Sequence, residues 1–395
     1  MPNQQLISRL QSLVTANHEN VVSLRRTIHQ HPELAYEEHQ TSALVVSELK
    51  RLGIEVICPV ASTGVIGILK CKNPESRCIA LRADMDALPI TEKNNCEYKS
   101  LNEGKMHACG HDAHTATLLG VANVLAQLKD ELEGTFKFIF QPSEEKIPSG
   151  ANAMIEAGAL LNPSVDAIFG WHVHPEMEAG EVGFCSGKFM ASSDEIYLTV
   201  KGKGGHAAQP QHFISPLVIA SEIILSLLPI TDLSIPRVLT FGKIEAHGAT
   251  NVIPEIAALA GTLRCFDESV RFSTHEMIQE VCRQIAQKYQ GDCDVNIVVG
   301  YPVLVNDEKL TKSSKDNAVA LLGSENVHDL PIRMGSEDFA YYTHHVPACF
   351  YRIGVGNKAK GITNAIHTPN FDIDEEALKT SVSLMSWIAV NALGS

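Results

Sequence analysis

The sequence lacks the marks of a membrane, secreted or nucleic-acid-binding protein. It has no run of about 18 apolar residues, the length that a helix needs to span a bilayer. Residues 1–5 show neither the basic start nor the apolar core of a signal peptide, and we expect none. The formal net charge of −14 leaves too few basic groups for a phosphate-binding face. We therefore expect neither a membrane nor a nucleic acid among its partners.

Two further absences narrow the class of protein. The ten cysteines occur singly, without a Cys-x-x-Cys motif, and several lie in apolar runs, as Cys78 and Cys349 do. This usage is typical of reduced thiols and predicts a cytoplasmic protein. No Gly-x-Gly-x-x-Gly follows an early strand-like run, which disfavours a flavin or nicotinamide enzyme.

The 395 residues, of which 45% are hydrophobic and 20% charged, suit a globular protein of two domains. Apolar strand-like runs alternate with segments of helical periodicity. This alternation predicts an α/β fold with a mostly parallel sheet and helices on both faces. The expected helices lie near 4–29, 37–52, 113–128, 308–321 and 374–392, and the expected strands near 54–58, 64–71, 78–82, 135–140, 166–170 and 348–353.

The pattern changes between residues 188 and 299. Strands and helices there follow the order βαββαβ, which is typical of a ferredoxin-like sandwich. Their expected positions are 195–200, 215–228, 237–245, 255–265, 270–289 and 293–299. We therefore expect a metal-binding catalytic domain of residues 1–187 plus 300–395, into which a smaller domain of residues 188–299 is inserted.

The segment Met106–His114 carries the strongest chemical signal. It holds three histidines, a cysteine and an aspartate, directly before an apolar helical run. Buried imidazoles and carboxylates are costly unless a positive ion organises them, so the segment indicates a metal site. The alternative is a surface loop that happens to be rich in histidine.

Polar groups at the ends of expected strands extend this signal. Asp84, the Cys109 segment, Glu144-Glu145 and His172 each fall where a buried strand is expected to end, and α/β proteins place their chemistry there. The ligand candidates exceed the three or four that one zinc ion needs, which favours two divalent ions: manganese, zinc, cobalt or nickel. These candidates are Cys109, His111, Glu145, His172 and His367.

Other candidates have ordinary explanations as well. Of the pair Glu144-Glu145, one carboxylate could bind metal while the other acts as general base, although such pairs are often exposed. In the inserted domain, His206 lies between glycines and alanines, and Asn251 and Arg264 adjoin apolar strands. Arg264 suits a carboxylate, but an arginine at a strand end is usually a solvated cation.

Taken together, these motifs resemble those of the amidohydrolases related to aminoacylase, which include hippurate hydrolase, indole-acetyl-amino-acid hydrolase and N-acyl-amino-acid deacetylases. The resemblance runs nearly end to end. Its motifs are His31-Pro32-Glu33-Leu34, Ala83–Pro89, the Cys109 segment, Gln141-Pro142-Ser143-Glu144-Glu145, Phe169–His172, the His206 glycine segment, Asn251–Pro254, Met334-Gly335-Ser336-Glu337-Asp338-Phe339 and His367-Thr368-Pro369.

The resemblance implies a role for each candidate. Cys109, His111, Glu145, His172 and His367 would bind two metal ions. Glu144 would be the base for an attacking water, and Asp86 would orient a metal ligand. His206 would stabilise the oxyanion, in its own active site or in that of a partner. The inserted domain would be a lid through which a homodimer forms. The chain departs from the usual family pattern at 146–150 and at Thr250, which affects substrate preference rather than the reaction.

The expected activity is hydrolysis of an N-acyl amino acid, such as an N-acetyl or N-benzoyl derivative, to a carboxylic acid and a free amino acid, with His206, Asn251 and Arg264 binding the substrate. Two alternatives stay open at this point. One is a metallo-exopeptidase, a dipeptidase or carboxypeptidase with the same two metal ions. The other is a binding protein with a retired site, which the complete set of ligand candidates argues against.

Overall fold

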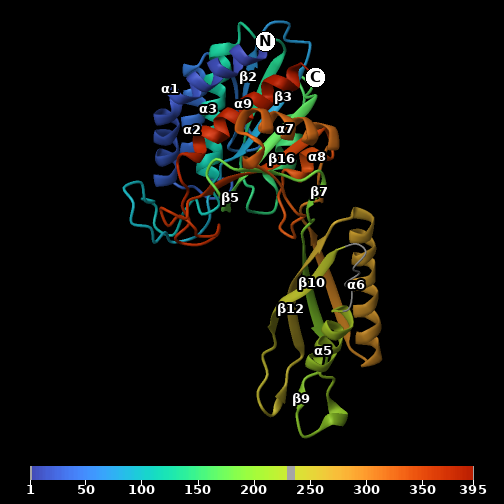
Figure 1. The fold of residues 1–395 in the computed structure, drawn as a ribbon. Coiled ribbons are helices and arrows are strands. Elements are labelled where there is room, and N and C mark those ends of the chain that lie inside the picture. Colours follow the sequence, from blue (N-terminus) through green and yellow to red (C-terminus); the bar gives the residue numbers. More distant parts are fainter. Residues whose placement is uncertain (1, 229–235, 395) are drawn as a thin grey trace. The chain divides into compact units, whose positions relative to one another are not determined.

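The computed structural model describes residues 2–228 and 236–394, and the chain divides into two compact units (Figure 1). The first unit comprises Met1–Gly187, Val305–Pro331 and Asp338–Ser395, and the second comprises Lys188–Leu304 and Ile332–Glu337. The sequence reading ended the inserted segment at residue 299 and did not assign 332–337 to it. This segment belongs to the second unit because its backbone pairs with that unit's first residues: Ala191 N–H donates to Arg333 O over 3.1 Å.

An eight-stranded sheet forms the centre of the first unit, in the order β1-β2-β4-β3-β5-β16-β6-β15. The inner pairs β4–β3, β3–β5 and β5–β16 are parallel, and the hairpin strands β1 and β2 join antiparallel at one edge. The strands span Glu55–Val60 (β1), Gly64–Lys70 (β2), Cys78–Asp84 (β3), Thr135–Gln141 (β4), Ala167–Glu178 (β5), Val182–Phe184 (β6), Val327–Asp329 (β15) and Ala348–Gly356 (β16).

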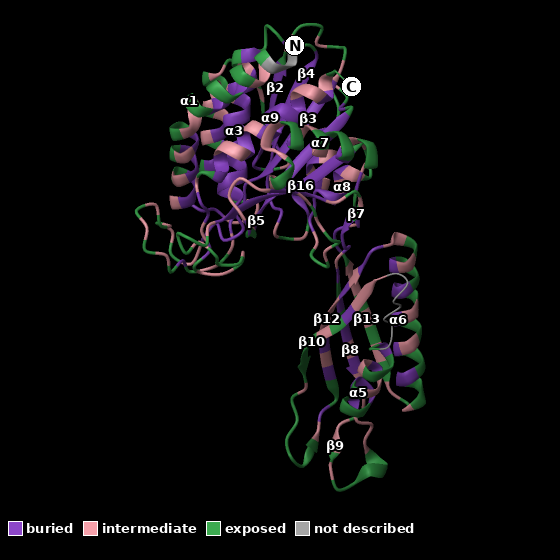
Figure 2. Cartoon of the chain, viewed as in Figure 1, coloured by how far each residue is buried: buried purple, intermediate pink, exposed green. Residues whose placement is uncertain are grey.

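Helices cover both faces of this sheet, as the sequence predicts. One face is covered by α1, α3, α7 and α9, which also pack against one another. The other face carries the short helices α4 and α8, which contact each other and strands β4 and β16 respectively. Every residue of β3, β4 and β16 is buried in consequence (Figure 2). The helices span Pro2–Gln30 (α1), His39–Arg51 (α2), His111–Leu128 (α3), Gly150–Glu156 (α4), Glu308–Leu322 (α7), Ala340–Thr343 (α8) and Ala377–Leu393 (α9).

Helix α3 is buried along nearly its whole length because it lies between α1, α9 and the sheet. Gly120 permits this close packing. A Cβ atom there would lie 2.8 Å from a methyl of Val21 on α1 and 2.9 Å from one of Val382 on α9. The helix that begins at His111 is thus fixed by apolar contacts on several sides, which gives the polar groups at its start a rigid support.

The second unit is a four-stranded antiparallel sheet in the order β10-β12-β8-β13, with helices α5 and α6 packed on it. Along the chain its main elements follow the order βαββαβ. This chain order, together with the strand order in the sheet, is that of a ferredoxin-like sandwich. They span Asp194–Lys201 (β8), Pro216–Leu227 (α5), Arg237–Glu245 (β10), Ile256–Cys265 (β12), Glu268–Lys288 (α6) and Asp292–Val299 (β13). Its core is separate from that of the first unit.

The remaining elements are short and were not expected from the sequence. They are β7 (Gly187–Met190), β9 (Gly205–His206), β11 (Val252–Ile253), β14 (Leu304–Asn306) and two 3-10 turns at Pro210–His212 and Ser324–Asn326. No helix within residues 2–228 and 236–394 is long and apolar enough to cross a membrane.

Candidate metal and active site

The candidate metal ligands gather at one edge of the sheet, where β3 and β4 end and β5 passes. Strand β3 ends at Asp84 and β4 at Gln141, just before Glu144. Two expectations need correction. No strand precedes Cys109; residues 85–110 form an irregular connection that leads directly into α3. His172 does not follow its strand but lies within β5, which continues to Glu178. The carboxyl ends of parallel strands still bring these groups together.

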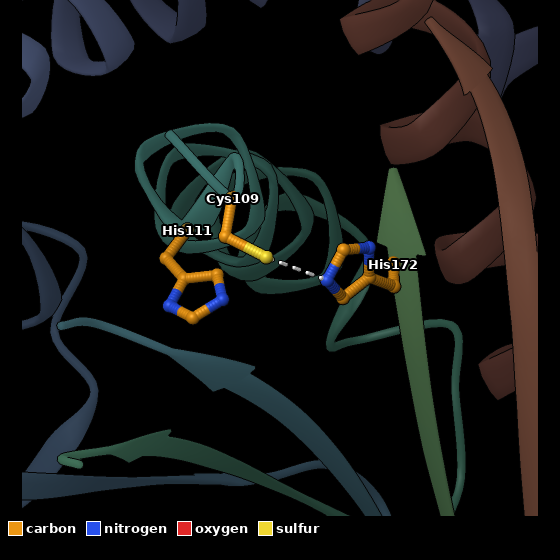
Figure 3. Close-up of side chains that lie close together, drawn as sticks. All are labelled: Cys109, His111 and His172. Carbon is orange, nitrogen blue, oxygen red and sulfur yellow. Dashed lines mark hydrogen bonds between the residues drawn. The ribbon is translucent and has the colours of Figure 1, made fainter. Parts of the chain in front are cut away.

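Cys109 lies at the centre of the first cluster. Its Sγ is 3.2 Å from Nε2 of His172 and 3.2 Å from Nε2 of His367. Figure 3 shows the thiol pointing at the His172 ring, with the His111 ring beside it. Gly110 makes this arrangement possible, because it has a φ of +81° and an added Cβ would lie 2.8 Å from Val173. A sharp backbone turn therefore brings both neighbouring side chains to one place.

Glu145 and His111 extend this cluster. Oε1 of Glu145 lies 3.1 Å from Nε2 of His367 and 4.0 Å from Nε2 of His111. Within the described part of the chain, Nε2 of His111 is buried and has no hydrogen-bond partner. Ligand atoms of Cys109, His111 and His172 lie within 4.8 Å of one another, as do those of Cys109, Glu145 and His367 and those of His111, Glu144 and Glu145. Each set could hold a metal ion.

Asp86 holds three of these groups in place. Its Oδ1 accepts the backbone N–H of Glu144 over 3.0 Å, and its Oδ2 accepts that of Glu145 over 2.9 Å. Nδ1 of His111 lies 3.3 Å from Oδ1 of the same carboxylate. Because Nδ1 faces Asp86, Nε2 is the ring nitrogen of His111 that faces the cluster.

A second buried network lies behind the cluster. Asp84 accepts a hydrogen bond from Arg82 Nη1 over 2.6 Å, and its other oxygen lies 2.6 Å from Nδ1 of His114. Nε2 of His114 in turn accepts the backbone N–H of Val173 over 3.1 Å. The sequence indicated Asp84 only as a polar group at a strand end and His114 only as part of the Met106–His114 segment. It did not indicate Arg82, which β3 presents among apolar residues.

The charges of the cluster fit divalent cations. Burial would lower the pKa of His111, but the carboxylates of Asp84 and Asp86 raise it to about 10. Burial and Arg352 lower the pKa of His172 well below its usual range, so its imidazole is neutral, the form that binds metal. Burial and Glu145 raise the pKa of the Cys109 thiol, an effect that a bound cation would reverse. The orphaned Nε2 and the surplus of carboxylates both favour a cation here.

Of the three candidate residues in the second unit, His206 and Asn251 lie together and Arg264 lies apart from them. His206 is exposed on β9, and the carbonyl of Asn251 accepts the Ala207 N–H over 3.0 Å, so His206 and Asn251 are neighbours. Arg264 lies near the opposite end of β12, about 25 Å along the strand from Ile256 at a rise of about 3.3 Å per residue. Its Nη1 donates to Ser336 Oγ over 2.6 Å, and burial lowers its pKa. The structure therefore does not bring Arg264 and His206 together within this unit.

An α/β unit that gathers imidazole, thiol and carboxylate groups at the ends of its strands is the architecture of a metal-dependent hydrolase. Residues 80–391 match peptidase family M20/M25/M40, and the chain belongs to this family. It is a hydrolase that acts on amide bonds.

Relatives of similar length agree with this assignment. The chain is 40% identical to the IAA-amino acid hydrolase ILR1-like 4 of Arabidopsis thaliana, over 94% of this chain and 86% of that protein. It is 37% identical to the N-acetylcysteine deacetylase of Bacillus subtilis, over 96% of this chain and 98% of that protein. It is also 36% identical to thermostable carboxypeptidase 2 of Saccharolobus solfataricus, over 98% of each chain.

A solved structure provides a comparison for the fold. The YXEP protein of Bacillus subtilis, described as a dinuclear metal binding peptidase of the M20 family, superposes with a TM-score of 0.83. The two chains are 34% identical, and the match covers 96% of this chain and 99% of that one.

Proposed function

We propose that the protein hydrolyses N-acyl amino acids, such as N-acetyl or N-benzoyl derivatives, to a carboxylic acid and a free amino acid. The observation that carries the proposal is the convergence of Glu144 and Glu145 with Cys109, His111 and His172 at one edge of the sheet. The names of two relatives, an IAA-amino acid hydrolase and an N-acetylcysteine deacetylase, support this substrate class.

Two divalent ions, manganese, zinc, cobalt or nickel, are the proposed cofactors. The residues that would hold them are Cys109, His111, Glu145, His172 and His367. When bound, such ions polarise a carbonyl group and lower the pKa of water. The mixed donor set of imidazole, thiolate and carboxylate suits these borderline metals better than magnesium or calcium.

Glu144 is the proposed general base and acid. Its side chain is buried, and its backbone N–H is fixed by Asp86, so the carboxylate has a defined position beside the proposed ligand Glu145. From there Glu144 takes the proton of the attacking water and delivers it to the leaving amine. Asp86 supports the reaction indirectly, because it holds the Glu144-Glu145 backbone and contacts His111.

His206, Asn251 and Arg264 are the proposed substrate-binding groups, and His206 stabilises the oxyanion. His206 pairs with Val252 on β11, just before β12 begins, whereas Arg264 lies near the far end of β12. This separation supports a homodimer, because one substrate cannot contact both groups of the same second unit. In this proposal residues 188–299 form a lid and dimerisation domain, and His206 serves the active site of the other subunit. The ten cysteines, all within the described part of the chain, form no disulfide, which supports a cytoplasmic location.

A carboxypeptidase among the relatives favours a second candidate, a metallo-exopeptidase that uses the same residues on peptides. The two candidates differ in substrate rather than in chemistry. A peptidase would accept substrates with a free amine, whereas the amidohydrolase would accept an acyl group in its place.

The test is release of free amino acids from a panel of N-acyl amino acids and dipeptides. Metal-stripped protein is reloaded separately with manganese, zinc, cobalt or nickel. Metal-dependent cleavage of N-acetyl or N-benzoyl substrates, with dipeptides untouched, is the expected result. Cleavage of dipeptides alone would establish the exopeptidase, and inactivity on every substrate with every metal would overturn both candidates.

A further inference from the structure

The loop that carries Glu144 and Glu145 is held by buried carboxylates. Three consecutive backbone N–H groups, those of Ser143, Glu144 and Glu145, each donate to a carboxylate oxygen. Asp86 accepts the second and the third. The first donates to Oε1 of Glu38 over 2.9 Å, from a residue 105 positions away in the sequence. The loop is therefore fixed from two separate parts of the chain.

Ser143 is the point at which the chain turns toward the site. It is fully buried and has a φ of +50°, a left-handed conformation that is unfavourable for a non-glycine residue. Its carbonyl accepts the N–H of Gly150 over 2.8 Å and closes the loop. The conformation of Ser143 therefore determines the direction in which Glu144 leaves the backbone, and the contacts of its N–H help to maintain that conformation.

Glu38 has no ordinary structural role that explains its burial. It precedes helix α2, but its side chain makes no capping hydrogen bond to that helix. The carboxylate of Glu33 does so instead and accepts the N–H groups of Gln40 and Thr41, each over 3.0 Å. Glu38 is fully buried, and its second oxygen accepts the hydroxyl of Thr63 over 2.5 Å. A buried carboxylate is costly unless hydrogen bonds compensate, and those of Glu38 go to Thr63 and to the Ser143 N–H.

We propose that Glu38 is a positioning residue for Glu144 and acts through its hydrogen bond to the Ser143 N–H. Its side-chain hydrogen bonds go to Ser143 and Thr63, neither of which is a proposed metal ligand. Its effect is to hold the turn at Ser143, and with it the Glu144 carboxylate, in the orientation that proton transfer needs. This inference rests on the proposed function, in which Glu144 is the base.

The proposal separates the reach of the Glu38 side chain from its charge. Glu38→Gln keeps the length and can still accept the Ser143 N–H, while its amide donates to Thr63. Glu38→Asp keeps the charge but is shorter by one methylene and no longer reaches Ser143. Glu38→Ala removes both. Thr63→Val is the matched control, because it removes the other hydrogen bond of the same carboxylate and leaves the contact with Ser143.

Two readouts test the proposal. The first is hydrogen–deuterium exchange of peptides that cover residues 141–151. We expect exchange about tenfold faster in the Ala and Asp variants, and exchange close to wild type in the Gln and Val variants. The second is steady-state hydrolysis of an N-acyl amino acid. We expect kcat to fall about 10–100-fold in the Ala and Asp variants, with KM within about threefold of wild type.

Each outcome decides the question. Unchanged exchange and unchanged kcat in both the Ala and the Asp variants would overturn the proposal. A Gln variant that is as impaired as the Ala variant, together with an Asp variant that behaves as wild type, would also overturn it, because charge rather than reach would then be what matters. If the Ala variant does not fold, the Gln and Asp variants give the same comparison. If wild-type protein cleaves no amide, the proposed function fails, and the exchange data alone still decide whether Glu38 holds the loop.

Discussion

Nδ1 of His114 lies 2.6 Å from Oδ1 of Asp84, and both side chains are buried. Because Nε2 of the same ring accepts the Val173 N–H, the ring carries its neutral-state proton on Nδ1 and donates it to Asp84. One imidazole thus connects the end of β3 to the backbone residue that follows the proposed ligand His172. The position of His172 depends on a residue that is not itself a proposed ligand.

Replacing His114 tests this connection. His114→Phe leaves the buried Val173 N–H and an Asp84 oxygen without partners. We expect a loss of about 1–3 kcal/mol in the free energy of unfolding of metal-stripped protein. Urea denaturation measures the loss. His39→Phe, at an exposed position, is the control, and equal stabilities for the two variants would contradict the prediction.

Glu144→Ala tests the base. We expect kcat to fall by about 10²–10⁴-fold, because no other group is proposed to accept the proton of water. Metal content should stay close to that of wild type, since the five proposed ligands are intact. Steady-state kinetics and elemental analysis of the purified variant measure both quantities. Glu156→Ala, an exposed glutamate on α4, controls for loss of charge, and retained turnover in the Glu144 variant would remove Glu144 from this role.

Cys109→Ser tests the thiol. The cysteine contacts both His172 and His367 and belongs to two of the groups that could hold a metal ion, so its loss would affect both groups. We expect affinity for zinc to fall by at least about 10–100-fold, and affinity for manganese to fall less, because serine oxygen is a harder donor than sulfur. Competition with a chelator of known affinity measures both. Cys58→Ser, at an exposed cysteine, should bind as wild type does; equal affinities in the two variants would count against a ligand role for Cys109.

The second unit should be sensitive to acid through Asp194. This buried carboxylate accepts hydrogen bonds from Arg271 Nε over 2.9 Å and from the Gly300 N–H over 3.1 Å. It also lies 2.7 Å from Nε2 of His275. Burial would raise the pKa of Asp194, but the hydrogen bonds and the charge of Arg271 hold that pKa below its usual value. The other acidic partner of Arg271 is Glu268. Since the folded pKa lies below the unfolded value of about 3.9, the stabilisation is present above about pH 4 and is lost as the pH falls through the folded value.

Asp194→Asn should therefore destabilise the second unit by about 3–5 kcal/mol near neutral pH and flatten its acid dependence. Circular dichroism during urea denaturation between about pH 7 and about pH 3 measures both effects. The two tryptophans, Trp171 and Trp387, belong to the first unit, so their fluorescence is an internal control. A variant with the acid dependence of wild type would show that Asp194 is not the responsible group.

The parts of the fold that were predicted well have strong local periodicity. Helix α1 and the βαββαβ order of the second unit follow from apolar repeats of 3.6 and 2 residues. Residues 85–110 have no such repeat, and their path depends on long-range contacts, such as the pairing of Leu88 with Met106. The sequence therefore could not show that Cys109 follows an irregular connection rather than a strand.

The same distinction applies to the site. Cys109 and His111 are close in sequence, and parallel strands explain why Glu145 and His172 join them. Their roles stay predictions, although the structure gathers them. The groups that hold them were not predictable, because a hydrogen bond between Glu38 and Ser143, or between Asp338 and Ser149, depends on tertiary packing that no local pattern records.

The first and last strands of the second unit are neighbours in its sheet, with Asp194 on β8 directly opposite Val299 on β13. The chain thus leaves the first unit and returns to it through adjacent strands, about 5 Å apart. Most of the second unit is therefore one continuous stretch of chain, to which only the segment Ile332–Glu337 is added from elsewhere. This stretch carries His206, Asn251 and Arg264 together, whereas Cys109 and Glu144 lie in the first unit. On the proposed roles, substitutions in this stretch would change substrate range and leave the bond-breaking groups of the first unit in place.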